Sequence, residues 1–167
     1  MAKIFAFKDK AQKHLYIGIT TLAKAVKITL GPSGKNVVYK KNGLVTVTKN
    51  GFEVAEQIFL ENSFENMGAK LLIETAKSTY NKVEDGTTTS IVLAEAMFEE
   101  GIKLFLTNID PNKIKKGMGI ALNILVKELS RLAIPIKDKE DLFHIAKMAA
   151  NNDSQIGSIL TEAIEAV

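Results

Sequence analysis

The residues best suited to chemistry lie in the segment Glu84-Asp85-Gly86-Thr87-Thr88-Thr89, directly before a predicted helix. The start of a helix presents unpaired backbone N–H groups and a partial positive charge, and both favour a phosphate. β-branched residues are poor helix formers, so three adjacent threonines at this position call for a reason. Asp85 adds a carboxylate, a ligand that Mg²⁺ takes together with phosphate oxygens and water. We therefore favour a phosphate and magnesium site over a plain N-cap followed by a Thr-rich first turn.

A second loop, Thr29-Leu30-Gly31-Pro32-Ser33-Gly34-Lys35, could also approach a phosphate. Its glycines allow the backbone to come close to a ligand and to turn N–H groups toward it. The loop follows a predicted helix and precedes a predicted strand, so it is not a Walker A loop, which runs from strand to helix. A turn that simply ends the helix explains the same residues equally well. This loop alone leaves both interpretations open.

Hydrophobic periodicity predicts the elements that position these loops. Apolar residues at steps of three and four indicate a helix over residues 9–28, with Asp9 as its N-cap and an end before Pro32. The period then changes to two, which predicts strands over residues 36–39 and 44–48. An Asn42-Gly43 turn signal lies between them.

The remainder of the chain is predicted to be helical. Lys49-Asn50-Gly51 is predicted as a turn that ends the second strand, Glu84-Asp85-Gly86 as a turn between helices, and Ile134-Pro135 as a break. The helices that we predict lie over residues 64–82, 88–106, 111–132, 139–150 and 154–167. The last of them ends at Val167 without a capping signal, so we expect the chain to be part of a longer protein.

Composition narrows the classes of function. The chain has 167 residues, of which 46% are hydrophobic and 25% charged, which is enough for one ordinary globular domain. There is no cysteine, and His14 and His144 lie far apart, so we expect neither a disulfide nor a histidine metal site. No apolar run approaches the ~18 residues of a membrane span. The N-terminus lacks signal-peptide and transit-peptide features, so we expect the protein to act where it is made.

The net charge is +3. The basic residues are almost all lysines, and Arg131 is the single arginine. Arginine is the preferred residue for bidentate recognition of bases and phosphates, so we do not expect nucleic-acid binding. The alternative is a helix-turn-helix protein whose turn is Thr29-Leu30-Gly31-Pro32. The lysines at 113, 115 and 116 are better explained as a solvated helix face.

Three segments in register resemble the group I (GroEL-type) chaperonins. The first, Thr29 to Pro32 followed by Gly34-Lys35-Asn36-Val37-Val38, resembles the chaperonin phosphate loop. Phe64-Glu65-Asn66-Met67-Gly68-Ala69 is similar to the start of the helix that leads to the family signature. Asp85-Gly86-Thr87-Thr88-Thr89 resembles that signature itself. The resemblance covers essentially the whole chain and identifies it as the N-terminal portion of such a subunit.

This resemblance implies a mainly α fold: a helical equatorial domain with a small β-hairpin over residues 1–134, then the first segment of an intermediate domain over 135–167. The apical and C-terminal segments are absent from this chain. The family hydrolyses ATP with Mg²⁺. By resemblance, Asp85 holds Mg²⁺, Gly86, Thr87, Thr88 and Thr89 bind the β- and γ-phosphates, and the remaining nucleotide contacts come from Thr29, Leu30, Gly31, Pro32 and Lys49.

The resemblance also implies partners. The hairpin over residues 36–48 would pair with the termini of a neighbouring subunit, for which Lys3 to Phe7 would supply an added strand. The full-length subunits would form a homo-oligomeric double ring. A co-chaperonin lid and unfolded proteins would bind through domains absent here, whereas neither nucleic acid nor membrane is expected. The implied location is the bacterial cytoplasm, or an organelle that makes its own chaperonin.

Three departures from the family pattern carry expectations. Asn50 stands where the family has an aspartate associated with hydrolysis, and an amide has no charge and cannot act as a base, so we expect slower turnover. A divergent paralogue with weak ATPase, acting as a binding or structural protein, is the alternative. The second departure is the hairpin tip, which is one residue shorter than in the family.

The third departure is the absence of the second half of the equatorial domain. Helices that would pack on this absent half should expose apolar surface.

Overall fold

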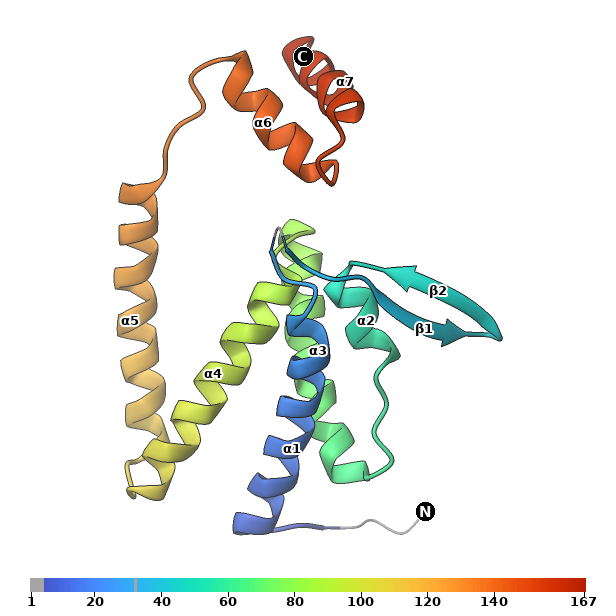
Figure 1. The fold of residues 1–167 in the computed structure, drawn as a ribbon. Coiled ribbons are helices and arrows are strands. Elements are labelled where there is room, and N and C mark those ends of the chain that lie inside the picture. Colours follow the sequence, from blue (N-terminus) through green and yellow to red (C-terminus); the bar gives the residue numbers. More distant parts are fainter. Residues whose placement is uncertain (1–4, 32) are drawn as a thin grey trace. The chain divides into compact units, whose positions relative to one another are not determined.

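The computed structural model describes residues 5–31 and 33–167, which form seven helices and one two-stranded sheet (Figure 1). Two compact units are present, one up to Ile114 and one from Lys115 to Val167. The predicted fold class, mainly α with a small β-hairpin, is confirmed. The boundary between the units falls inside one continuous helix, and the predicted division of domains at residue 134 stays a prediction.

Helix α1 spans Lys8–Lys27 and supplies much of the core of the first unit through Ile19, Leu22, Ala23 and Val26. Its N-cap is Phe7, which makes no side-chain capping hydrogen bond. The prediction that Asp9 caps this helix is therefore wrong. Asp9 lies in the first turn, where a carboxylate is favourable beside the positive end of the helix dipole.

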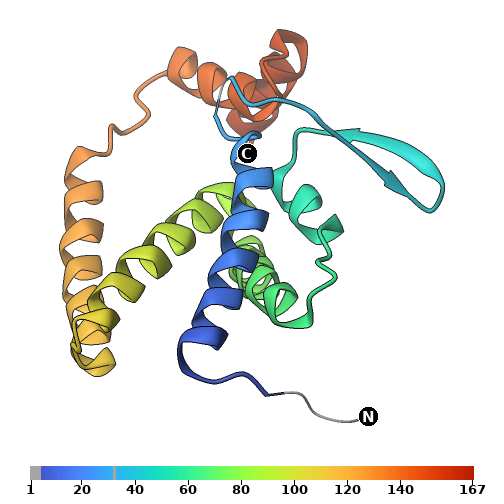
Figure 2. The ribbon, with the colours of Figure 1, turned by 60° about the horizontal axis from the view of Figure 1, so that its bottom comes forward.

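Strands β1 (Val37–Lys41) and β2 (Leu44–Thr48) form an antiparallel hairpin that extends away from the helices of its unit (Figures 1 and 2). The register pairs Val37 with Thr48 and Lys41 with Leu44, which leaves a two-residue turn. Asn42 and Gly43 have φ of 51° and 85°, as this turn requires. Strand β1 therefore runs two residues further than predicted, because the tight turn allows Lys40 and Lys41 to pair.

Helix α2 (Gly51–Gln57) begins where the sequence predicts only a turn. Asn50 is its N-cap, and Asn50 Oδ1 accepts hydrogen bonds from the backbone N–H groups of Phe52 (2.9 Å) and Glu53 (3.3 Å). Asparagine followed by glycine is a turn signal, but asparagine is also among the best N-caps, so the pair marks both kinds of structure.

Helices α3 (Ser63–Val83) and α4 (Thr87–Leu106) complete the first unit by packing with α1. The approach of α1 to α3 is close because a glycine lies on each helix. A Cβ on Gly18 would collide with the carbonyl oxygen of Glu65, and one on Gly68 with that of Leu15. The shared core contains Leu72, Ala76 and Ile91.

The second unit contains most of α5 (Pro111–Leu132) and the pair α6 (Lys139–Ala149) and α7 (Ser154–Glu165). Helices α6 and α7 pack together where Gly157 lies against the backbone of Lys147. Helix α5 buries none of its residues. Across the described residues, the structure has no helix that is both long and apolar enough for a membrane span.

Candidate functional site

Three segments that the sequence assigns to one site do meet in the structure. Gly51, the first residue of α2, is buried, and a Cβ there would collide with Thr88 Oγ1 and lie 2.8 Å from Thr29 Oγ1. Thr29 follows α1, and Thr88 lies in the first turn of α4. The loop after α1, the start of α2 and the start of α4 therefore lie against one another at Gly51. Gly51 is absent from the predicted site residues, and its pairing with Asn50 is the one local signal for it.

The start of α4 differs from the starts of four other helices. Side-chain oxygens of Asn50, Asn62, Asp138 and Asp153 cap α2, α3, α6 and α7. The N-cap of helix α4 is instead Gly86, whose φ is 72°, and the helix has neither a side-chain cap nor an acidic residue in its first turn. The N–H groups of this turn and their partial positive charge are therefore available to an anion.

The residues around this helix start suit a phosphate with a divalent cation. Thr87 and Thr88 are half-buried, whereas Thr89 and Asp85 are exposed. Asp85 Oδ1 accepts a hydrogen bond from the N–H of Gly86 at 2.6 Å, which fixes the carboxylate beside the helix start. Residues 5–31 and 33–167 contain no cluster of three or more acidic or histidine side chains that could hold a metal ion without other ligands. The residues thus fit Mg²⁺ that is held by Asp85 together with phosphate oxygens and water.

The loop after α1 is closed by its own backbone. Lys35 N–H donates to the carbonyl of Ile28 at 2.7 Å, and Gly34 N–H donates to that of Gly31 at 3.0 Å. Gly31 has φ of 77° and open space around its α-carbon, whereas Leu30 is exposed. Pro32, a predicted nucleotide contact, lies outside the described residues. The loop therefore offers a backbone surface that a ligand can approach closely.

Thr29 is buried, and its hydroxyl donates to the carbonyl of Val26 at 2.8 Å. Its hydroxyl proton is therefore already used within the loop. Lys49 and Asn50 are both exposed on the segment that leads into α2. Since Asn50 Oδ1 caps that helix, and aspartate caps helices equally well, capping does not explain why an amide stands here.

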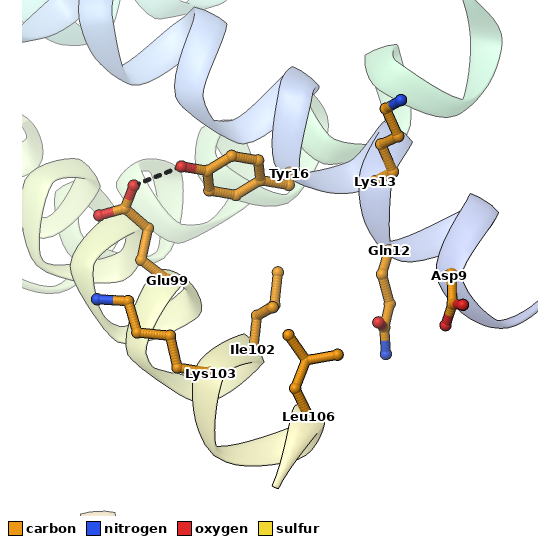
Figure 3. Close-up of a pocket in the computed structure, with 8 residues that line it drawn as sticks. All are labelled: Asp9, Gln12, Lys13, Tyr16, Glu99, Ile102, Lys103 and Leu106. Atoms are coloured by element: carbon orange, nitrogen blue, oxygen red, sulfur yellow. Dashed lines mark hydrogen bonds between the residues drawn. The ribbon is translucent and has the colours of Figure 1, made fainter.

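A groove of about 400 Å³ lies elsewhere, between the first half of α1 and the last turns of α4 (Figure 3). Its walls include Tyr16, Glu99, Ile102 and Leu106, and no predicted site residue lines it. Tyr16 O–H donates to Glu99 Oε1 at 2.8 Å. This hydrogen bond, and then the negative charge of Glu99, raise the pKa of Tyr16. Periodicity assigns these residues to helices but does not indicate a groove between them.

The helix-turn-helix alternative does not fit the fold. The loop after α1 leads into strand β1, whereas that motif needs a second helix directly after its turn. The structure therefore removes the one feature that supported a nucleic-acid-binding function.

The first unit thus combines packed helices, a protruding hairpin and a helix start suited to a phosphate. The model of the TCP-1/cpn60 chaperonin family matches residues 22–167, and the chain belongs to this family. The crystal structure of a group III chaperonin in the open state is similar, with a TM-score of 0.75 and 28% sequence identity. That match covers 92% of this chain and 31% of the group III chain, so the chain spans about a third of that protein's length.

Proposed function

We propose that this chain is the N-terminal part of an ATP-dependent protein-folding chaperonin subunit of the group I type. Family membership supports the chaperone assignment. The observation that carries the nucleotide site is the meeting of Thr29, Gly51 and Thr88, because three segments separated in sequence come together at an uncapped helix start. A site formed by backbone N–H groups and hydroxyls suits the phosphates of a nucleotide.

We assign different parts of Mg²⁺-ATP to different residues of the site. The N–H groups and hydroxyls of Gly86, Thr87, Thr88 and Thr89 would hold the β- and γ-phosphates at the positive end of α4. The backbone of Thr29 to Pro32, together with Lys49, would hold the rest of the nucleotide. Asp85 would hold Mg²⁺, which neutralises phosphate charge when it is bound. Phosphoryl transfer depends mainly on such positioning and electrostatic stabilisation.

The group I assignment and the partners rest on the sequence motifs. We propose a homo-oligomeric double ring in which the β1–β2 hairpin pairs with the termini of a neighbouring subunit. The hairpin suits this role because four of its apolar side chains are exposed: Val38, Leu44, Val45 and Val47. A co-chaperonin lid and unfolded proteins would bind to other parts of the protein. Its proposed location is the bacterial cytoplasm or an organelle that makes its own chaperonin.

The experiment that tests this function is Mg²⁺-dependent ATP binding and turnover by the whole protein, unmodified and as Asn50→Asp. Binding that requires Mg²⁺ is expected, together with slow turnover that the aspartate increases roughly 10- to 100-fold by restoring a group able to act on the attacking water. Asp85→Asn is the control variant, since it should lose the dependence on Mg²⁺. An unmodified protein that binds no ATP with or without Mg²⁺ would contradict the proposal.

A divergent paralogue with weak ATPase is a second candidate, and Asn50 is the feature that favours it. The side chain holds the start of α2 yet carries no charge. If the unmodified protein turns over ATP readily and Asn50→Asp leaves the rate unchanged, this candidate is excluded and the protein is an ordinary ATPase. Turnover that stays negligible in both forms, with ATP still bound, would favour a role in holding proteins over folding them.

A further inference from the structure

Glu95 is the one charged residue among the buried side chains of residues 5–7, 9–31 and 33–167, and it is 3% exposed. Its Oε2 forms an ion pair with Nζ of Lys27, whose side chain is 43% exposed. Among the described residues, no group forms a hydrogen bond with this oxygen.

The ion pair lies on the same two helices as both proposed phosphate-binding segments. Lys27 is the last residue of α1, and Thr29 follows shortly after it. Glu95 lies about two helical turns after Thr88 on nearly the same side of α4. Ile91, which lies between them on α4, is fully buried. The pair therefore joins the end of α1 to α4. Its two residues lie two positions before Thr29 and seven positions after Thr88 in the chain.

Stability alone is a weak explanation for such a pair. Taking a carboxylate out of water is costly, and apolar side chains of similar volume often serve a core equally well. The α1–α4 contact already contains Val26 and Ile91, both fully buried. An ion pair between two such groups also favours one position of one helix along the other.

We propose that Lys27 and Glu95 are a positioning pair, which holds the loop after α1 in register with the first turn of α4 so that both face the same phosphate. This inference rests on the proposed function and assigns to that site two residues that the sequence motifs do not include. Neither residue is proposed to touch the nucleotide. Loss of the pair should therefore leave α1 and α4 folded but less well aligned for binding.

The test is the Kd of the whole protein for Mg²⁺-ATP, measured well below the unfolding temperature, with Tm measured separately without nucleotide. Glu95→Gln keeps the side-chain shape and removes the charge. We expect its Kd to rise roughly 10- to 100-fold, the range seen when groups that orient binding residues are removed. Glu99→Gln is the matched control, because it makes the same chemical change one turn further along α4, where the partner is Tyr16. Its Kd should stay within about twofold of the unmodified value, which is ordinary experimental variation.

Lys27→Gln provides the second variant, and it is informative even if Glu95→Gln does not fold, because Lys27 is half-exposed. The positioning role predicts that both single variants raise Kd by similar factors. An unchanged Kd in a folded variant with a lowered Tm would overturn the inference, since the pair would then serve stability alone. A rise in Kd for Lys27→Gln only would also overturn it, because Lys27 would then act on the nucleotide directly.

The failure of this inference can be told apart from the failure of the proposed function. If the unmodified protein does not bind Mg²⁺-ATP, both are overturned. If it binds and the two charge-removing variants bind equally well, the proposed function stands and the positioning pair does not.

Discussion

Gly51 shows at the scale of single residues how the proposed site depends on a missing side chain. It is buried, and the hydroxyls of Thr29 and Thr88 approach the place that a Cβ would occupy. Two segments distant in sequence can therefore close on the start of α2 only because this residue is glycine.

Replacing Gly51 by alanine tests this close approach. We expect Gly51→Ala to lower the free energy of unfolding by about 1–3 kcal/mol, as overpacking of a tight site does. It should also weaken Mg²⁺-ATP binding, since Thr29 and Thr88 would have to move apart. Gly101→Ala is the control, because a Cβ there meets nothing within 4 Å on α4. Urea unfolding measures the change, and equal stabilities for the two variants would contradict the prediction.

Tyr16 supports a second prediction at this scale. Its hydrogen bond to Glu99, and then the charge of that carboxylate, raise its pKa above the ordinary value of 10.0. A raised pKa in the folded state stabilises the fold below the ordinary pKa, and this contribution disappears as pH rises through the folded value. Glu99→Gln should therefore lower the pH at which Tyr16 ionises.

The measurement is an absorbance titration of the phenol, with Tyr16→Phe used to isolate its signal. Glu100→Gln is the control, because Glu100 contacts Lys103 rather than Tyr16. A titration of Tyr16 that does not shift in Glu99→Gln would show that the hydrogen bond is not formed in solution.

Helices α3 and α4 begin in different ways. Helix α3 starts at an asparagine cap, in which Asn62 Oδ1 accepts from the N–H groups of Phe64 and Glu65 at 3.0 and 3.3 Å. Helix α4, directly after it in the chain, starts without any side-chain cap. The same N–H groups are thus satisfied within the protein in one helix and left for a ligand in the other.

Removal of the α3 cap should cost stability without touching the proposed site. Asn62→Ala is expected to lower the free energy of unfolding by about 1 kcal/mol, the usual value of an asparagine cap. Asn36→Ala, at an exposed position before β1, should change it by less than about 0.5 kcal/mol. Chemical denaturation followed by circular dichroism compares the two. If Asn36→Ala costs as much as Asn62→Ala, the capping explanation is wrong.

At the scale of the whole molecule, much apolar surface faces solvent. Helix α5 exposes a stripe of large side chains at steps of three and four: Met118, Leu122, Leu125, Leu129 and Leu132. Such a stripe normally faces a core, and contiguous exposed apolar surface of this kind marks an interaction site. The stripe is exposed, whereas the expectation that it packs on an absent half of the protein stays a prediction.

The stripe predicts that residues 1–167, expressed alone, bind a hydrophobic dye such as ANS. Replacing Leu125 and Leu129 by serine should reduce the dye signal with helix content retained, because both side chains are more than half exposed. A double replacement of Lys116 and Asn123 by serine on the same helix serves as the control. Dye binding that is absent, or that persists unchanged in the leucine variant, would contradict the prediction.

Local chemistry in the sequence was sufficient for most of the elements. The periods of 3.6 and two residues, Pro111, and the Asn42-Gly43 turn each act over a few residues, so α5 and the hairpin were predicted to within two residues at each end. Asn50 was harder to interpret, because the same residue type begins turns and helices, and α2 was missed.

What only the tertiary structure decided is which segments meet. The sequence placed candidate phosphate-binding residues in loops after α1 and before α4, and resemblance to a family joined them. Their contact around Gly51, and the burial of Glu95 beside Lys27, arise from the packing of α1 on α4. Such contacts depend on distances between residues far apart in the chain. No local propensity or spacing encodes those distances, because they are set by the way a whole core packs.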